Sequence, residues 1–323
     1  MTVTRQDADK LDIQFSVVSG SRENLLFDCI ASVLDTMKDS RYSWRLTAIS
    51  NDARPGLVRR LRERFPTIDV IENSEPKGFA ANHNVVLRTS GARYTWILND
   101  DLVIMPGTID QIVAYMDQPR NEKVAVVSPR LMNPDGSLQP STYSFPTIPQ
   151  TLLGFSGIRD LRITNKLLTV IAPILRRGAG SSRFWAHDQT IEVDTFRGAC
   201  VAVRMSAVKE VGVMTEAALV GAEEIEWHRR LKDRGWKIIF FADASVIHYG
   251  SQTVAEGSQD LYSEYLKGLL HYFKSHRSPA RFRAFVAALV GLYTARLSIA
   301  RVQRNEKKIE VARQYLQVVR NAM

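Results

Sequence analysis

The sequence predicts an α/β fold in which a mostly parallel, Rossmann-like sheet is flanked by helices and followed by a helical C-terminal extension. Three observations predict this fold. Short apolar runs alternate with segments of helical periodicity through the first part of the chain. One apolar run ends abruptly at adjacent carboxylates, Asp100 and Asp101, as expected at the carboxyl edge of an open sheet. Beyond Gly257 the pattern becomes purely helical.

Length and composition limit the class of protein. The chain has 323 residues, a formal net charge of +9 and two cysteines. The length predicts one large domain with an appendage, or two domains. The positive charge favours a polyanionic partner, but the sequence shows no zinc-finger spacing and no aromatic-basic strand, so we do not expect nucleic acid as that partner. Cys29 and Cys200 form no metal pair by spacing, and without a recognisable leader we expect a cytoplasmic chain with two buried thiols.

The first part of the sequence predicts repeated strand-helix units. The expected strands are Ile13 to Val18, Trp44 to Ile49, Ile68 to Ile71 and Tyr94 to Leu98. The expected helices are Leu25 to Met37, Leu57 to Phe65 and Phe79 to Leu87. Alternation of this kind favours parallel strands joined by crossover helices.

The second part is less regular. Residues from about 140 to 190 are rich in Pro, Ser, Gly and Arg, which suits a lid, an acceptor loop or a plain surface loop. The other expected elements are a helix over Thr108 to Met116, a strand over Val124 to Val127, a turn over Asn133 to Gly136, strands over Val193 to Phe196 and Val201 to Arg204, helices over Ser206 to Val211 and Glu223 to Arg234, and a strand over Ile238 to Phe241.

Two further groups complete the candidate chemistry. Glu223 and Glu224 stand at the start of a predicted helix, and His248 follows a predicted strand. An imidazole at a strand end can complete a divalent-metal site begun by Asp101, so the pieces together suggest metal-assisted group transfer. Taken singly, each has a plainer interpretation: the aspartates cap a turn, Glu224 pairs with an arginine at helical spacing, and His248 is a core histidine.

Several motifs occur in a fixed order and carry a resemblance. They are the Lys77-Gly78-Phe79-Ala80-Ala81-Asn82 segment, Leu98-Asn99-Asp100-Asp101, the string from Arg130 to Pro146, Gly198 to Cys200, Glu223-Glu224-Ile225-Glu226, and His248. Over roughly Ile13 to Thr253 the chain resembles the inverting nucleotide-sugar glycosyltransferases of family two, especially their rhamnosyltransferase-like branch. The resemblance implies a GT-A nucleotide-diphospho-sugar transferase fold.

The resemblance also implies residue roles. Glu224 would be the general base, although the family more often has Asp there, and Asp101 and His248 would hold Mn²⁺ or Mg²⁺. Glu223 and Trp227 would lie on the acceptor side. Ser50 replaces an aspartate that usually grips the nucleobase, so either Asp52 substitutes or the base is bound differently. The implied nucleotide and donor residues are Ser19, Ser50, Asn51, Asp52, Lys77, Gly78, Asn82, Asn99, Asp100 and Gly198.

The implied reaction moves a hexose, with rhamnose as the best guess, from a TDP, UDP or GDP donor to a lipid-linked or polysaccharide acceptor. Two alternatives stay open: a nucleotide-sugar nucleotidyltransferase, and a catalytically idle sugar- or membrane-binding module. We expect a catalytic domain over residues 1–256, with its donor half at about 1–128 and its acceptor half at about 129–256. The helical extension would span residues 257–323.

The C-terminal extension contains the apolar stretch RAFVAALVGLYTARLSIARVQR, which Arg296 and Arg301 interrupt. We predict that it is too short and too charged to cross a bilayer. Two alternatives remain. The helix lies at the inner face of the plasma membrane with its arginines at lipid phosphates, or it packs against the main domain or in a homo-oligomer interface.

Overall fold

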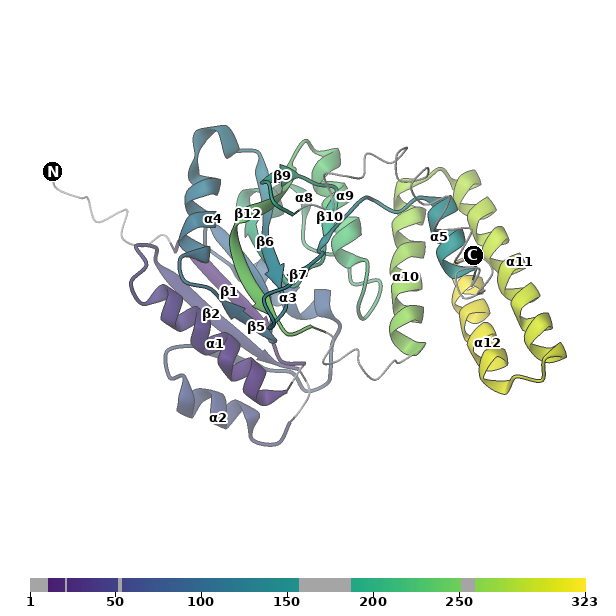
Figure 1. Cartoon of the computed structure of the whole chain (residues 1–323), viewed down its shortest axis with the longest axis horizontal. Helices are drawn as coiled ribbons and strands as arrows, with labels where there is room; N and C mark the ends of the chain where they lie inside the picture. The colour runs from purple at the N-terminus through teal and green to yellow at the C-terminus, as the bar shows by residue number, and fades with distance from the viewer. Residues whose placement is uncertain (1–10, 21, 52–53, 157–186, 251–258) are drawn as a thin grey trace.

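The computed structural model describes residues 11–20, 22–51, 54–156, 187–250 and 259–323. Within these residues, ten strands form one mixed sheet in the order β3-β2-β1-β4-β11-β6-β12-β5, with β7 beside β6 and β9 beside β12. Helices cover both faces of the sheet, and the C-terminal helices stand beside it (Figure 1). The predicted α/β fold with a helical C-terminal region is confirmed.

One half of the sheet is parallel and the other half is mixed. β1 runs parallel to β2 and β4, and β2 runs parallel to β3. β11 is antiparallel to β4 and β6, whereas β12 is parallel to β6. The strands are β1 (Ile13–Val18), β2 (Trp44–Ser50), β3 (Asp69–Glu72), β4 (Tyr94–Asn99), β5 (Leu102–Ile104), β6 (Val124–Met132), β7 (Leu138–Gln139), β8 (Thr142–Tyr143), β9 (Ile191–Glu192), β10 (Thr195–Phe196), β11 (Cys200–Arg204) and β12 (Lys237–His248).

Two apolar cores lie on the two faces of the sheet. α1, α2 and α4 pack on one face, and α3, α8 and α9 pack on the other. Each helix buries residues at spacings of three or four, because that period turns one stripe toward the sheet. The helices are α1 (Glu23–Met37), α2 (Leu57–Arg64), α3 (Phe79–Thr89), α4 (Thr108–Asp117), η1 (Pro119–Asn121), α5 (Ile148–Phe155), α8 (Met205–Val211), α9 (Glu223–Asp233), α10 (Gln259–His276), α11 (Pro279–Val302) and α12 (Glu306–Arg320).

The elements differ from the predicted ones in three places. The strand expected over Ile238 to Phe241 is β12, which continues to His248, so His248 lies in the strand and not after it. The single strand expected over Val193 to Phe196 is instead β10, with β9 just before it, and the two strands belong to different sheets. Within the segment from about 140 to 190, residues 157–186 lie outside the described part of the chain, and α5 precedes them.

The C-terminal helices share a third apolar core with α5. α11 is 24 residues long and, by length and composition alone, could cross a membrane, so the prediction that this segment is too short and too charged is wrong. A buried core helix passes the same test, and 28% of the most apolar window of α11 is buried within the protein. Arg296, which we placed at lipid phosphates, donates to the carbonyl oxygen of Phe155 at 2.6 Å and so ties α11 to α5.

Candidate active site

Strand pairing explains why Asp101 and His248 meet. β4 ends at Asn99, the chain turns through Asp100 and Asp101, and β5 then pairs antiparallel with the end of β12. In that register Leu102 is opposite His248. The residue before Leu102 therefore lies beside the imidazole, although the two side chains are 147 positions apart in a chain of 323 residues.

The two side chains face each other in a nearly dry environment. His248 Nε2 lies 3.3 Å from Asp101 Oδ1, and the two residues are 3% and 6% exposed. His248 Nδ1 is 2.5 Å from the Gln139 side-chain oxygen, and Asn99 Nδ2 is 3.4 Å from Nε2. With Gln139 as acceptor, Nδ1 carries the proton and Nε2 presents its lone pair to the carboxylate.

This arrangement fits a divalent cation. Asp101 Oδ1 is buried without a hydrogen-bond donor among the described residues, and the imidazole nitrogen Nε2, which the Asn99 amide approaches at 3.4 Å, faces it. Two facing lone pairs are stabilised by a cation that both can bind, and a carboxylate with an imidazole suits Mn²⁺. The described residues contain no group of three or more His, Cys, Asp and Glu side chains that could hold a metal, so a metal here would need further ligands from substrate phosphates and water.

Gly250 shows how tightly the imidazole is surrounded. Its φ of +53° is in the left-handed region, and a Cβ there would lie 3.0 Å from Gln139 Nε2 and 3.5 Å from the His248 ring. A side chain would therefore press on both the imidazole and its hydrogen-bond partner. Glycine at this position lets the chain turn away immediately after β12.

The loops after β1 and β2 lie beside the aspartates. Asp100 is 6% exposed, and its Oδ2 accepts a hydrogen bond from the Gly20 N–H at 2.7 Å. Ser19, also buried, accepts from the Asn51 N–H through its hydroxyl at 2.9 Å. Because β1 lies between β2 and β4, these contacts tie three neighbouring carboxyl-edge loops together.

A network of asparagine amides forms the rest of the predicted donor side. Asn73, which is 6% exposed, donates to the side-chain oxygens of Asn51 at 2.9 Å and Asn82 at 2.6 Å. Asn51 also accepts from the Lys77 N–H at 2.8 Å, and Asn82 donates to the Lys77 and Gly78 carbonyls. The structure therefore brings together four of the predicted donor residues, with Asn73 as an unpredicted link.

The start of α3 is less available to an anion than we expected. The first N–H of the helix, that of Phe79, already donates to the Leu219 carbonyl at 2.8 Å. A Cβ on Gly78 would lie 2.7 Å from the same carbonyl oxygen, so only glycine fits here. The Lys77 side chain is exposed, and a phosphate role for it stays a prediction.

The remaining donor predictions have mixed placements. Ser50 is 1% exposed, and its carbonyl accepts from the Asn73 N–H at 3.0 Å, so it supports the asparagine network through its backbone. Asp52 lies outside the described residues. A Cβ on Gly198 would make only an ordinary van der Waals contact among the described residues, with a Phe79 ring carbon at 3.9 Å.

Glu223 and Glu224 begin α9 under unusual electrostatic conditions. Burial raises the pKa of Glu223 to about 8, and the neighbouring Glu224 carboxylate adds to the shift. Glu223 Oε2 is buried and has no hydrogen-bond partner within the described part of the chain. Burial also raises the pKa of Glu224, against the opposing effects of Arg197 and of backbone N–H groups that include that of Gly198.

Gly198 and Ala199 lie between Glu224 and the end of β4. The Gly198 backbone lowers the pKa of Glu224, and the next carbonyl, that of Ala199, accepts from the Asn99 N–H at 2.8 Å. Asn99 in turn contacts His248. One backbone segment thus connects Glu224 with the end of β4.

Trp227 is not on the acceptor side. It is 1% exposed, its Nε1–H donates to the Gly212 carbonyl at 2.8 Å, and it packs in the core formed with α8. The indole is one of the larger apolar groups of α9, so burying it in the interior outweighs its proximity in sequence to Glu224. Glu226, by contrast, forms the expected helical pair with Arg230 at 2.8 Å.

Sequence reasoning missed Gln139 and Asn73. Gln139 reaches the site because β7 pairs with β6 at Leu131, and β12 pairs with the same residue from the other side. A two-residue strand has no periodicity to detect, so this pairing was not predictable, although Gln139 lies within the Arg130 to Pro146 motif. Asn73 follows β3 directly, and that placement beside the loop after β2 was a usable signal.

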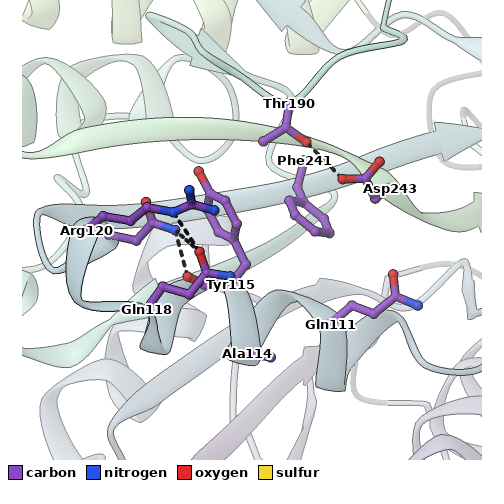
Figure 2. Close-up of a pocket in the computed structure, with 9 residues that line it drawn as sticks. Gln111, Ala114, Tyr115, Gln118, Arg120, Thr190, Phe241 and Asp243 are labelled. Carbon is purple, nitrogen blue, oxygen red and sulfur yellow. Dashed lines mark hydrogen bonds between the residues drawn. The ribbon is translucent and has the colours of Figure 1, made fainter.

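A second hollow in the structure lies elsewhere. A pocket of about 600 Å³ lies between α4 and β12, and its lining residues include Tyr115, Arg120, Phe241 and Asp243. Figure 2 shows these side chains around the pocket. None of the predicted site residues lines it. Its polar side chains bond to one another, as Thr190 and Asp243 do at 3.5 Å, so we assign the chemistry to the carboxyl edge of the sheet.

Comparisons with known proteins identify the family of the chain. Residues 12–262 match the family described as "Glycosyltransferase like family 2". An N-acetylglucosaminyl-diphospho-decaprenol L-rhamnosyltransferase of Mycobacterium tuberculosis is 23% identical over 62% of this chain, and the match spans 64% of that relative. The O-antigen biosynthesis protein RfbC of Myxococcus xanthus is 22% identical over 71% of this chain but only 16% of its own length.

Two solved structures share the fold at low sequence identity. The mannosyltransferase PcManGT from Pyrobaculum calidifontis, in complex with GDP-Man and Mn²⁺, has a TM-score of 0.52 and 16% identity, and the match covers 97% of this chain and 76% of that one. GalNAc-T7 with UDP, GalNAc and Mn²⁺ has a TM-score of 0.55 and 14% identity, and covers 82% and 48%. The chain therefore belongs to glycosyltransferase family 2, as a rhamnosyltransferase-like protein with a GT-A fold.

Proposed function

We propose that this glycosyltransferase is an inverting, metal-dependent hexosyltransferase that transfers rhamnose or a related hexose from a nucleoside diphosphate donor. The observation that carries the proposal is the buried pair of Asp101 Oδ1 and His248 Nε2, 3.3 Å apart at the carboxyl edge of the sheet. Asp100, Asn51 and Asn82 border that edge with polar groups. The rhamnosyltransferase named above and the Mn²⁺ complexes of the two structural neighbours support the choice of donor class and metal.

In this proposal the chain supplies a general base and, at the carboxyl edge of the sheet, the residues that bind the donor. Glu224 removes the proton from an acceptor hydroxyl, whose oxygen then forms a bond to the anomeric carbon while the bond to the diphosphate breaks. The proton ends on the Glu224 carboxylate, and the nucleoside diphosphate leaves. One displacement inverts the anomeric carbon. The raised pKa of Glu224 suits this role, because a base works best when its pKa approaches the working pH.

Asp101 and His248 are the residues that would hold Mn²⁺ or Mg²⁺ in this site. When bound, such a cation neutralises the negative charge that develops on the leaving diphosphate. Gln139 accepts from Nδ1 and so keeps the imidazole in the tautomer whose Nε2 lone pair faces Asp101.

The choice of acceptor class rests on the mycobacterial relative. A lipid-linked or polysaccharide acceptor agrees with the printed activity of the mycobacterial relative. Together with the net charge of +9, this favours a cytoplasmic protein in peripheral contact with the inner face of the plasma membrane. Co-sedimentation with anionic liposomes tests the contact: binding that falls as salt rises supports it, and absence of binding at low salt rejects it.

Calorimetry tests the proposed function directly. We would titrate the protein with TDP, UDP and GDP, with and without Mn²⁺, and repeat the titrations with Asp101→Asn. We expect one nucleotide to bind with Mn²⁺ and the substitution to weaken that binding at least about 100-fold, because it removes a charged ligand. Asp110→Asn, an aspartate on α4 away from this edge, is the matched control. Equal binding without metal, or binding unaffected by Asp101→Asn, would refute the metal site.

A further inference from the structure

Large exposed apolar side chains surround the start of α9. Leu219 and Val220, which immediately precede it, are 61% and 37% exposed. Tyr143 and Tyr265, from the strand β8 and the helix α10, are 41% and 37% exposed. Apolar groups of this size are usually buried, so a group of them beside two buried carboxylates indicates a surface that another molecule covers.

Tyr265 lies near both Glu224 and Tyr143. The pKa of Tyr265 is raised by burial first, then by the Glu224 carboxylate and by Tyr143. Arg197, whose charge acts on Glu224, also approaches Tyr143, with 3.4 Å between Nη2 and the tyrosine hydroxyl. The base therefore has a tyrosine from α10, a tyrosine from β8 and a guanidinium close to it.

α10 is held firmly against the loop that precedes α9. A Cβ on Gly268 would lie 2.3 Å from the Gly221 carbonyl oxygen, so the two backbones touch directly. A Cβ on Gly221 would lie 3.2 Å from the Tyr265 ring, which packs over that glycine. Glu264 accepts a hydrogen bond from the Leu219 N–H at 2.8 Å and pairs with Lys267. These contacts fix where the Tyr265 ring stands relative to Glu224.

We propose that Tyr265 and Tyr143 form the walls of the acceptor-sugar subsite, with the Tyr265 ring stacking on a pyranose whose hydroxyl faces Glu224. The inference rests on the proposed function. One face of a pyranose carries apolar C–H groups, which pack against the electron-rich face of an aromatic ring, while its hydroxyls need charged or polar partners. Glu224 and Arg197 supply such partners beside the tyrosines.

Tyr265 lies just beyond the residues that match the family model. The family match ends at residue 262, so Tyr265, Glu264 and Gly268 lie beyond the part shared with the family. Tyr143 and Arg197, by contrast, lie within it. The C-terminal helices of this chain thus complete the subsite with a wall of their own, and that wall is a determinant of acceptor choice.

Binding measurements with simple sugars test the subsite without requiring the natural acceptor. We would measure saturation-transfer NMR with the methyl glycosides of glucose, galactose, N-acetylglucosamine and rhamnose, with and without Mn²⁺ and nucleoside diphosphate. At least one glycoside should bind the wild type, and Tyr265→Ala should weaken it about tenfold. Tyr265→Phe should retain binding within about twofold, because the stacking ring remains.

The matched control is Tyr262→Ala, which removes a more exposed tyrosine on the same helix, near Tyr315 rather than Glu224. It should leave glycoside binding unchanged. Unfolding temperatures and Mn²⁺-dependent nucleotide binding of all variants should match the wild type. The inference is overturned if no glycoside binds the wild type, or if Tyr265→Ala binds as well as the wild type. Intact nucleotide binding in that case leaves the proposed function standing, whereas loss of Asp101-dependent nucleotide binding refutes the proposed function itself.

Discussion

The site contains two pairs of adjacent carboxylates whose surroundings differ. Asp100 and Asp101 end a strand and meet an N–H group and an imidazole, respectively. Glu223 and Glu224 begin a helix, and burial raises the pKa of both. In the proposed function, the first pair attracts a cation and the second holds or accepts a proton. Cation binding and proton transfer would thus be separated by the local environments of two pairs of carboxylates.

The largest expected effect tests the proton-transfer side of this comparison. Glu224→Gln removes the basic carboxylate and keeps its shape, so turnover with donor and acceptor should fall by about 10²- to 10⁴-fold. Nucleotide affinity, measured by calorimetry, should stay within about twofold, because the metal edge is unchanged. Glu122→Gln, at an exposed carboxylate, is the control. Unchanged turnover in Glu224→Gln would assign the base elsewhere.

We expect an effect of intermediate size on nucleotide binding from replacing Gln139, the hydrogen-bond partner of the His248 imidazole. Gln139→Leu removes the oxygen that accepts from His248 Nδ1 and frees the ring to change tautomer. Mn²⁺-dependent nucleotide binding should weaken about 10- to 100-fold, which is typical of losing the hydrogen bond that orients a metal-binding histidine. Gln111→Leu on α4 should have no effect. Equal affinities for Gln139→Leu and wild type would show that His248 needs no orienting partner.

The smallest expected effect concerns stability and pH. The pKa of Glu223 is about 8 in the folded protein against an ordinary value of 4.5, so between these values only the folded state keeps the proton. Stability should therefore fall progressively as pH rises from about 4.5 to about 8. Glu223→Gln should flatten this dependence in thermal unfolding curves measured across that range.

Two results would contradict the assignment to Glu223. One is a wild-type unfolding temperature that does not fall over this pH range more than that of Glu223→Gln. The other is a Glu122→Gln control that flattens the dependence as strongly, since an exposed carboxylate gains little from being neutral.

The proposed metal site of Asp101 and His248 was predictable because both residues stand out in the local sequence. A strand ending in Asp100-Asp101 and a histidine after a later strand are visible directly, and the antiparallel pairing of β5 with β12 then brings them together. The parallel half of the sheet followed from the alternation of strands and helices, whereas the GT-A fold followed from the family resemblance of the motifs. These features depend on short segments whose pattern and order carry most of the information.

The contacts that tune the site were not predictable. Gln139 reaches His248 only through the register of three strands, and Tyr265 reaches Glu224 through the packing of a helix some forty residues later in the chain. Trp227 was misplaced because three residues separate it from Glu224, which predicts a shared helix face. The left-handed Ala222 at φ +69° sets how α9 begins, and in the folded chain the indole is buried against α8.

The backbone of Leu219 forms hydrogen bonds both to α10 and to the start of α3. Its N–H donates to Glu264 on α10, while its carbonyl accepts from Phe79 at the start of α3 and leaves no room for a side chain on Gly78. Leu219 therefore joins the start of α3 to the helix that carries Tyr265 through the carbonyl and the N–H of one residue. The proposed donor side and the proposed acceptor wall thus share a single backbone anchor.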